Sequence, residues 1–258
     1  MKILFYFVVC LLATLAGGIS GVGGGVIIKP VLDAVSGLPV AEISFLSGCT
    51  VLAMTAVSVF NSRGGSVKIE PRRGTLLAVG GAAGGIAGKE LFEIVRAMGG
   101  TTVMIAQQTM MIILTLAVLF YTLRKARIKT LQVSNSVACL LIGFLLGVLS
   151  AFLGIGGGPI NLMILSFFFS MDSKTAALNS LYIILFSQAA SFLSTVLGKS
   201  VPEFEWPVMG VMVLGGVLGG IFGRRISKRL DNSGIDRIFF VLLIIITLIS
   251  VYNLVRYL

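Results

Sequence analysis

Apolar runs of membrane-spanning length follow one another along nearly the whole chain. They cover residues 3–17, 42–62, 74–95, 101–122, 133–153, 176–197, 207–223 and 237–255. A transmembrane helix needs about 20 mostly apolar residues to cross a hydrocarbon core about 30 Å thick. Only 12% of the residues are charged, and they lie between these runs, so no stretch is left for a soluble domain. The pattern predicts an all-α polytopic membrane protein.

Two further apolar stretches, residues 26–36 and 159–170, are too short to span a membrane, and each follows a cluster of glycines. If residues 3–36 formed one helix it would be about 50 Å long, and residues 133–170 would form one of about 57 Å. Both lengths far exceed the bilayer core, so the chain must turn back at the glycines. We expect a glycine-broken re-entrant hairpin at each place.

The two halves of the chain resemble each other. Gly21-Val22-Gly23-Gly24-Gly25 aligns with Gly154-Ile155-Gly156-Gly157-Gly158 at an offset of 133 residues, and Ser47 aligns with Ser180 at the same offset. Further on, the segment 80–89 (GGAAGGIAGK) matches 215–224 (GGVLGGIFGR). Self-similarity of this kind indicates a duplication. We assign a first repeat to residues 1–122, a basic linker to 123–132 and a second repeat to 133–258, each repeat having one hairpin and three transmembrane helices.

The distribution of basic residues predicts the orientation of these repeats. Three crossings are an odd number, so the two halves would be inverted relative to each other. With a turn-back in each half, 14 of the 20 lysines and arginines lie on one side, whereas single crossings would divide them 11 to 9. Since cytoplasmic loops are enriched in Lys and Arg, the linker is expected in the cytoplasm and both termini outside. The 14 residues are Arg63, Lys68, Arg72, Arg73, Arg124, Lys125, Arg127, Lys129, Lys174, Arg224, Arg225, Lys228, Arg229 and Arg237.

The composition disfavours several classes of function. The chain has no histidine, which excludes a histidine-based triad or zinc site, and its membrane segments carry no paired carboxylates. The net charge of +10 comes from short basic clusters between apolar runs rather than from one solvated face, so nucleic acid is not an expected partner. We expect no enzyme activity, no cofactor and no metal.

The glycine clusters are the first candidate site. Glycine allows a positive φ, and a half-helix that starts there directs unsatisfied N–H groups and a partial positive charge beyond its tip. Two such tips from inverted halves would face each other near the membrane midplane and form an anion site. We expect positive φ and a substrate contact at Gly24 and Gly157, and no basic side chain at the site. The glycines assigned to substrate binding are Gly21, Gly23, Gly24, Gly25, Gly154, Gly156, Gly157 and Gly158.

Polar residues inside the predicted spans are the second group of candidates, because burying them is costly. Ser47, Asn179 and Ser180 lie near the starts of the spans that follow the hairpins, and we assign them to substrate binding. A serine hydroxyl can alternatively bond the carbonyl one turn back. The amides Gln107, Gln108 and Gln188 are expected to bridge helices, the alternative being that they line a path through the membrane.

Other residues have structural interpretations. Lys29 and Asp33, four residues apart, are expected to pair near the membrane surface, the alternative being a positive charge on the substrate path. The glycines within 80–88 and 215–223 are expected to permit close helix packing.

Several motifs together resemble the sulfite exporter TauE/SafE family, also called the toluene sulfonate uptake permease family. They are the duplicated GxGGG cluster with its apolar half-helix, the turn Gly37-Leu38-Pro39, the serine five residues after Glu42, and Ala177-Leu178-Asn179-Ser180-Leu181 in the second copy. The resemblance covers essentially the whole chain. Lys29 departs from the usual apolar residue, and Leu46 replaces a frequent threonine. The resemblance implies a multi-pass transporter of small anions, often sulfite or sulfonates, in the bacterial cytoplasmic membrane.

The residues predict a secondary transporter of a small anion that works by alternating access, and the resemblance implies an exporter of sulfite or organosulfonates. Its expected partners are a small anionic substrate, the lipid bilayer, a proton or sodium ion as coupling ion, and a second copy in a homodimer. An anion channel and a permease for a small carboxylate remain the alternatives.

Overall fold

The computed structural model describes residues 2–62, 71–98, 100–153 and 158–257. Within these ranges the regular structure is entirely helical, which confirms the predicted all-α class. The helices are α1 (Lys2–Ser20), α2 (Gly25–Val35), α3 (Val40–Phe60), α4 (Pro71–Met98), α5 (Gly100–Arg124), the 3-10 helix η1 (Lys125–Arg127), α6 (Ser136–Leu153), α7 (Gly158–Phe169), α8 (Ser173–Leu197), α9 (Trp206–Arg229) and α10 (Asn232–Tyr257).

Every apolar stretch found in the sequence corresponds to one α-helix, but several helices extend further. α9 continues to Arg229, beyond the apolar run that ends at residue 223, and α10 begins at Asn232 rather than at residue 237. Arg and Lys are good helix formers, and their long side chains reach toward water at a helix end. Apolarity therefore marks the part of a helix in lipid, and the helix itself is longer.

Seven helices are long and apolar enough to span a membrane among the residues that the structure describes: α1, α3, α5, α6, α8, α9 and α10. α4 has 28 residues, but its glycines and its charged last turns lower its mean hydropathy. α2 and α7, with 11 and 12 residues, are about 16 and 18 Å long, roughly half of the hydrocarbon thickness.

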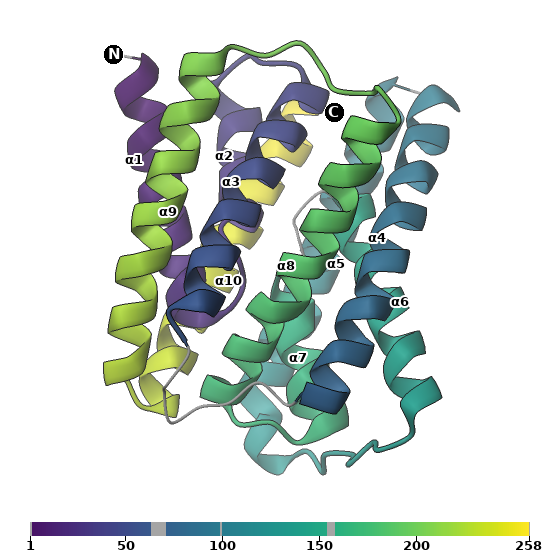
Figure 1. Ribbon diagram of the computed structural model, residues 1–258, viewed down its shortest axis with the longest axis vertical. Helices are drawn as coiled ribbons and strands as arrows, with labels where there is room; N and C mark the ends of the chain where they lie inside the picture. The colour runs from purple at the N-terminus through teal and green to yellow at the C-terminus, as the bar shows by residue number, and fades with distance from the viewer. Residues whose placement is uncertain (1, 63–70, 99, 154–157, 258) are drawn as a thin grey trace.

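Hydrogen bonds locate the ends of the two short helices. Arg256, near the end of α10, donates from Nη1 to the carbonyl oxygen of Ala34 at 2.6 Å, so α2 ends beside the C-terminus. Val133, in the segment before α6, donates its N–H to the carbonyl oxygen of Phe168 at 2.9 Å, so α7 ends where α6 begins. Both chain termini lie at one end of the bundle and the segment between α5 and α6 at the other (Figure 1). We call these the terminal end and the linker end.

Glycines set the closest helix contacts. On α4, Gly80, Gly84 and Gly88 face α6 so closely that a Cβ atom would overlap the carbonyl oxygens of Leu140, Phe144 and Val148. On α9, Gly215, Gly219 and Gly223 face α1 in the same way, against Phe7, Leu11 and Leu15. Spacing by four residues aligns the glycines on one helix face. The expectation that these stretches permit close packing is confirmed.

The pairs of packed helices recur in both halves. α4 contacts α6 and α8, whereas α9 contacts α1 and α3, so each of these glycine-rich helices packs on the other half of the chain. α3 and α8 also contact each other. Apolar residues fill the spaces between these helices, among them Leu46, Met54, Leu178 and Ile183, all almost completely buried. This packing brings α2, α3, α4, α6 and α8 around one space.

Candidate functional site

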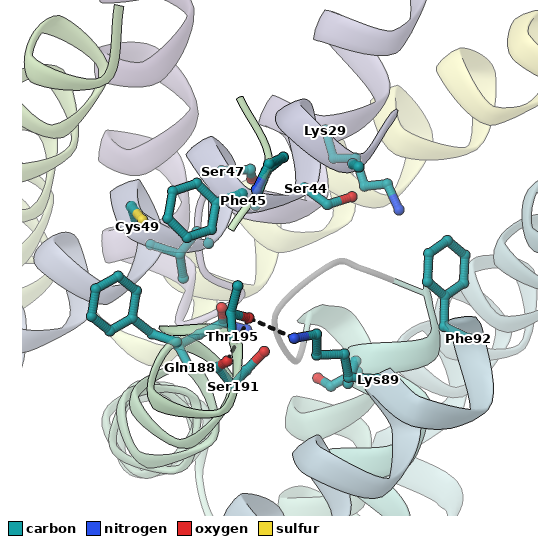
Figure 2. A pocket seen from close by; sticks show the side chains of 18 of the residues that line it. Lys29, Ser44, Phe45, Ser47, Cys49, Lys89, Phe92, Gln188, Ser191 and Thr195 are labelled. Atoms are coloured by element: carbon teal, nitrogen blue, oxygen red, sulfur yellow. Dashed lines mark hydrogen bonds between the residues drawn. The ribbon is translucent and has the colours of Figure 1, made fainter. Parts of the chain in front are cut away.

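A cavity of about 130 Å³ lies between α2, α3, α4, α6 and α8 (Figure 2). It reaches toward the terminal end, because Ser200 and Pro202, which follow α8, are part of its wall. Its wall also includes Gly25, Ser47, Ser150 and Gln188. A water molecule occupies about 30 Å³ of the liquid, so the space suits a small oxyanion with a few waters.

The turn between α1 and α2 is built by two glycines with positive φ, Gly21 at 81° and Gly23 at 80°. Gly24, in contrast, has a φ of −73°, so the expectation of positive φ at this residue is wrong. Space, not conformation, restricts Gly24, because a Cβ atom there would lie 2.5 Å from Cγ2 of Thr14. In this cluster Gly21 and Gly23 supply the positive φ of the turn, and Gly24 lets the backbone pass close to Thr14.

The N-terminus of α2 lies in the wall of the cavity. The carbonyl oxygen of Gly24 accepts the N–H groups of Ile27 and Ile28 at 3.1 and 3.0 Å. The N–H groups of Gly25 and Val26 precede this first helical bond, as at any helix start. Since Gly25 lines the cavity, the partial positive charge of the helix N-terminus is next to it.

The three polar side chains assigned to substrate binding occupy different surroundings. Ser47 lines the cavity with 2% of its surface exposed. Ser180 and Asn179 are completely buried and are not among the residues that line the cavity. Ser180 donates from Oγ to the carbonyl oxygen of Gly21 at 2.7 Å, and Asn179 donates from Nδ2 to that of Thr175 at 2.9 Å. Ser180 therefore holds the first hairpin turn against α8, although it is the repeat counterpart of Ser47.

The second glycine cluster is described at its last residue only. Gly158 has a φ of 50° and begins α7. Gly154, Gly156 and Gly157 lie outside the described residues. The role assigned to these three glycines stays a prediction.

Two lysines belong to the cavity wall, so the expectation of a site without basic side chains is wrong. Lys29, 7% exposed, donates from Nζ to the carbonyl oxygen of Leu153 at 3.2 Å, and this nitrogen is 5.6 Å from the ring centroid of Phe92. Lys89 points from α4 toward α8 and donates to Oγ1 of Thr195 at 2.7 Å and to Oγ of Ser200 at 3.2 Å (Figure 2). Lys29 thus lies in the cavity wall, as does Lys89.

The signal for Lys89 in the sequence is its place in the repeat. It ends the glycine-rich segment that matches 215–224, and the matching residue, Arg224, is also basic. The place of Lys89 in a glycine-rich helix does not predict that it lines a cavity, because its hydrogen-bond partner Thr195 is 106 residues away in the sequence.

Neutral hydrogen-bond donors complete the wall. Ser44, Ser150, Ser191 and Thr195 supply hydroxyl groups, and Oγ of Ser44 is buried without a hydrogen-bond partner among the described residues. Gln188 lines the cavity instead of bridging helices. Gln107 does bridge helices, because its Nε2 donates to the carbonyl oxygen of Phe152 at 2.6 Å, as predicted. Ammonium, hydroxyl, amide and helix N–H groups around one space form a wall rich in donors for an anion.

Comparison with known proteins identifies one family. The model of the family described as Sulfite exporter TauE/SafE matches residues 6–249. The match includes both hairpins and every residue that lines the cavity. No curated protein and no solved structure matches the chain.

Proposed function

Because the chain belongs to the sulfite exporter TauE/SafE family, we propose that it is a secondary transporter, an exporter, of a small sulfur oxyanion. Sulfite or a short organosulfonate is the substrate, and the bacterial cytoplasmic membrane is the barrier it crosses. The family consists of membrane transporters rather than enzymes, and seven membrane-spanning helices fit a multi-pass protein of this kind. The observation that carries the proposal is the cavity with two lysines and a helix N-terminus in its wall.

The positive charge in the cavity wall favours an anion over a cation as the substrate. Moving an anion out of water without replacing its hydrogen bonds costs several kcal/mol. Lys29, Lys89 and the N–H groups at the start of α2 replace water with fixed donors. A cation at the same place would meet positive charge and would need a cage of oxygen ligands. Glu93 is the one carboxylate among the described residues of the wall, and it is exposed.

Two inverted repeats, residues 1–122 and 133–258, would provide alternating access. The packing pairs support this proposal, because α1 on α9 corresponds to α6 on α4, and α3 on α9 corresponds to α8 on α4. The ends of the short helices support it too, since α2 ends at the terminal end and α7 at the linker end. Each hairpin then enters and leaves the membrane on its own side.

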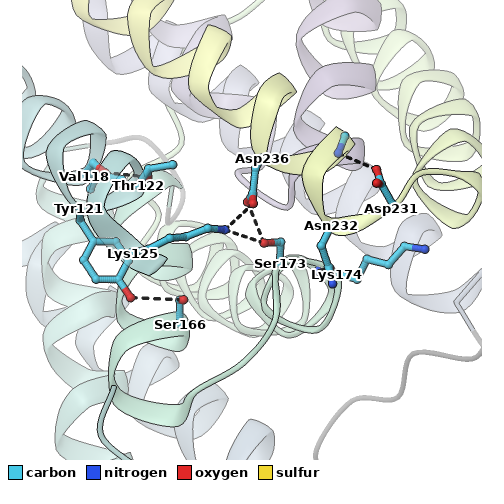
Figure 3. Close-up of polar contacts among 11 residues, drawn as sticks. Val118, Tyr121, Thr122, Lys125, Ser166, Ser173, Lys174, Asp231, Asn232 and Asp236 are labelled. Atoms are coloured by element: carbon cyan, nitrogen blue, oxygen red, sulfur yellow. Dashed lines mark hydrogen bonds and ion pairs between the residues drawn. The ribbon is translucent and has the colours of Figure 1, made fainter. Parts of the chain in front are cut away.

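The state of the molecule is open toward the terminal end. The cavity described above has about 130 Å³, whereas a cavity at the linker end, lined by residues of α5, α7, α8 and α10, has about 30 Å³. Among the described residues, a cluster of polar contacts closes part of the linker end, where Asp236 of α10 pairs with Lys125 and accepts from Oγ of Ser173 at 2.7 Å (Figure 3). Since positive loops favour a cytoplasmic linker end, this is an outward-open state.

Labelling of single cysteines tests the orientation. In a variant without Cys10, Cys49 and Cys139, an impermeant thiol reagent outside the cell should label Glu203→Cys and leave Arg127→Cys unlabelled. Both side chains are exposed, so reactivity reports the side of the membrane and not burial. Equal labelling at both positions would contradict the inverted arrangement, and labelling at position 127 alone would contradict the cytoplasmic place of the linker.

Binding and flux of a panel of anions test the substrate. The purified protein is titrated by calorimetry with sulfite, a taurine-like sulfonate, lactate and chloride, and flux of the same anions is measured in proteoliposomes. Sulfite or the sulfonate is expected to bind most tightly, with saturable flux that depends on a counter-ion gradient. Preference for lactate would contradict the sulfur part alone, absence of binding and flux for all four anions would contradict anion transport, and flux that does not saturate would indicate a channel.

A further inference from the structure

The internal repeat equates two basic residues that face opposite ends of the molecule. Lys89 on α4 and Arg224 on α9 both end the matched glycine-rich segments. Lys89 lies against α8, where Ser191 and Thr195 supply hydroxyl groups. At the offset of 133 residues that aligns the hairpins, these two correspond to Ser58 and Ser62 of the first half.

The two hydroxyl pairs have the same local geometry. Thr195 donates from Oγ1 to the carbonyl oxygen of Ser191 at 2.9 Å, and Ser62 donates from Oγ to that of Ser58 at 2.7 Å. Each pair lies at the C-terminal end of a long helix or just past it, α8 for one and α3 for the other. Both copies of the repeat thus keep a pair of hydroxyl groups one turn apart.

Arg224 lies on the face of α9 that contacts this second pair. One turn before it, the carbonyl oxygen of Gly220 accepts from Oγ of Ser58 at 3.4 Å. One turn after it, Lys228 donates from Nζ to the carbonyl oxygen of Asn61 at 2.7 Å. Residues four apart share a helix face, so Arg224 faces the segment from Ser58 to Ser62.

The two basic residues differ in exposure. Lys89 lines the cavity that reaches the terminal end, and it donates two hydrogen bonds, to Thr195 and Ser200. Arg224 is 4% exposed, donates from Nη1 to Oγ of Ser227 at a long 3.4 Å, and its Nε has no hydrogen-bond partner among the described residues. An enclosed guanidinium with an unused donor is costly, and an anion would satisfy it.

We propose that Lys89 and Arg224 bind the anion at two separate subsites, one open to the outside and one open to the cytoplasm, which act in turn. The proposal rests on the transport function above and adds to it the residue that receives the anion at each face. In the outward-open state Lys89 meets the anion and Arg224 is enclosed. When the linker end opens and the terminal end closes, Arg224 and the hydroxyl groups of Ser58 and Ser62 meet the anion from the cytoplasm, and Lys89 becomes enclosed.

Sided transport kinetics test the pair. Uptake of radioactive sulfite is measured in right-side-out vesicles, which present the outer face, and in inside-out vesicles, which present the cytoplasmic face. Loss of one charge-assisted hydrogen bond weakens binding about tenfold or more. Lys89→Gln should therefore raise KM about tenfold at the outer face with little change at the cytoplasmic face, and Arg224→Gln should do the reverse.

Matched variants control for charge and folding. Lys89→Arg and Arg224→Lys keep the charge and should retain most of the affinity at their faces. Arg225→Gln removes an exposed charge next to Arg224, and Lys199→Gln removes one near the terminal end, so both should leave KM unchanged. Equal changes at both faces for either principal variant, or an effect of Arg225→Gln as large as that of Arg224→Gln, would overturn the sided assignment.

A second measurement needs no substrate and separates this inference from the proposed function. In the variant without native cysteines, an impermeant thiol reagent applied outside should label Lys89→Cys and not Arg224→Cys. Absence of flux for every anion in wild-type vesicles would refute the transport function. The labelling would still show whether positions 89 and 224 are accessible from outside. Outside labelling of Arg224→Cys, or none of Lys89→Cys, would overturn the inference.

Discussion

Replacing Gly84 with Val is expected to remove most of the folded protein from the membrane. A Cβ atom at Gly84 would overlap the carbonyl oxygen of Phe144 and lie 2.8 Å from its carbonyl carbon. These are backbone atoms of α6, so relief requires α4 and α6 to separate, and packing between helices is what holds a membrane bundle together. The loss should exceed the about 1–3 kcal/mol that is typical of overpacking with side chains. Yield and thermal unfolding of the protein in detergent measure it.

Two other glycines allow a comparison of Val variants that should differ in stability. Gly81, on the same helix, has as its nearest neighbour Cγ2 of Ile183 at 3.2 Å, a side-chain atom that can turn away. Gly210 on α9 has no atom within 4 Å of its added Cβ. The unfolding temperature should therefore fall least for Gly210→Val, more for Gly81→Val and most for Gly84→Val. Equal stability of the three variants would mean that close packing of α4 on α6 does not hold the bundle together.

Replacing Gly21 with Ala should abolish transport even where some protein still folds. Its φ of 81° costs a residue with a side chain about 1–2 kcal/mol. In addition, its Cβ would overlap the backbone of Ala177 on α8. Relief must move the hairpin turn, break the 2.7 Å hydrogen bond from Ser180 and shift the start of α2 in the cavity wall. Sulfite flux in proteoliposomes, normalised to the amount of folded protein, measures the effect.

Gly37 supplies the matched control for backbone strain. Its φ of 70° is similar, but its added Cβ would have no atom within 4 Å. Gly37→Ala should therefore lower the unfolding temperature slightly and leave transport intact. If both variants lost transport equally, strain alone would be responsible, and if Gly21→Ala transported at the normal rate, the first turn would have no part in the site.

The helices and the broken segments could be predicted from the sequence because their causes are local. A run of apolar residues must form a helix in lipid, since its backbone can find partners in no other way within one segment. Residues 3–36 and 133–170 were each too long to cross the membrane as one helix, so a turn at the glycines followed from length. The close packing of Gly84 and Gly219 was predicted because small residues let helices approach closely in membranes. The helix ends that lie beyond the apolar runs could not be predicted in this way, because apolar residues mark only the part of a helix that lies in lipid.

The composition of the site was decided by tertiary structure. Gly25 and Ser47, both assigned to substrate binding from the sequence, line the cavity, whereas Ser180 bonds to the turn at Gly21, 159 residues away in the chain. Lys29 enters the wall because α6 ends beside it, and Lys89 because α8 passes α4. Each of these positions depends on which helices from opposite halves pack together. The sequence of one helix shows which of its own residues share a face, but not which other helix packs against that face. The set of donors that meet in the cavity is therefore known only from the assembled bundle.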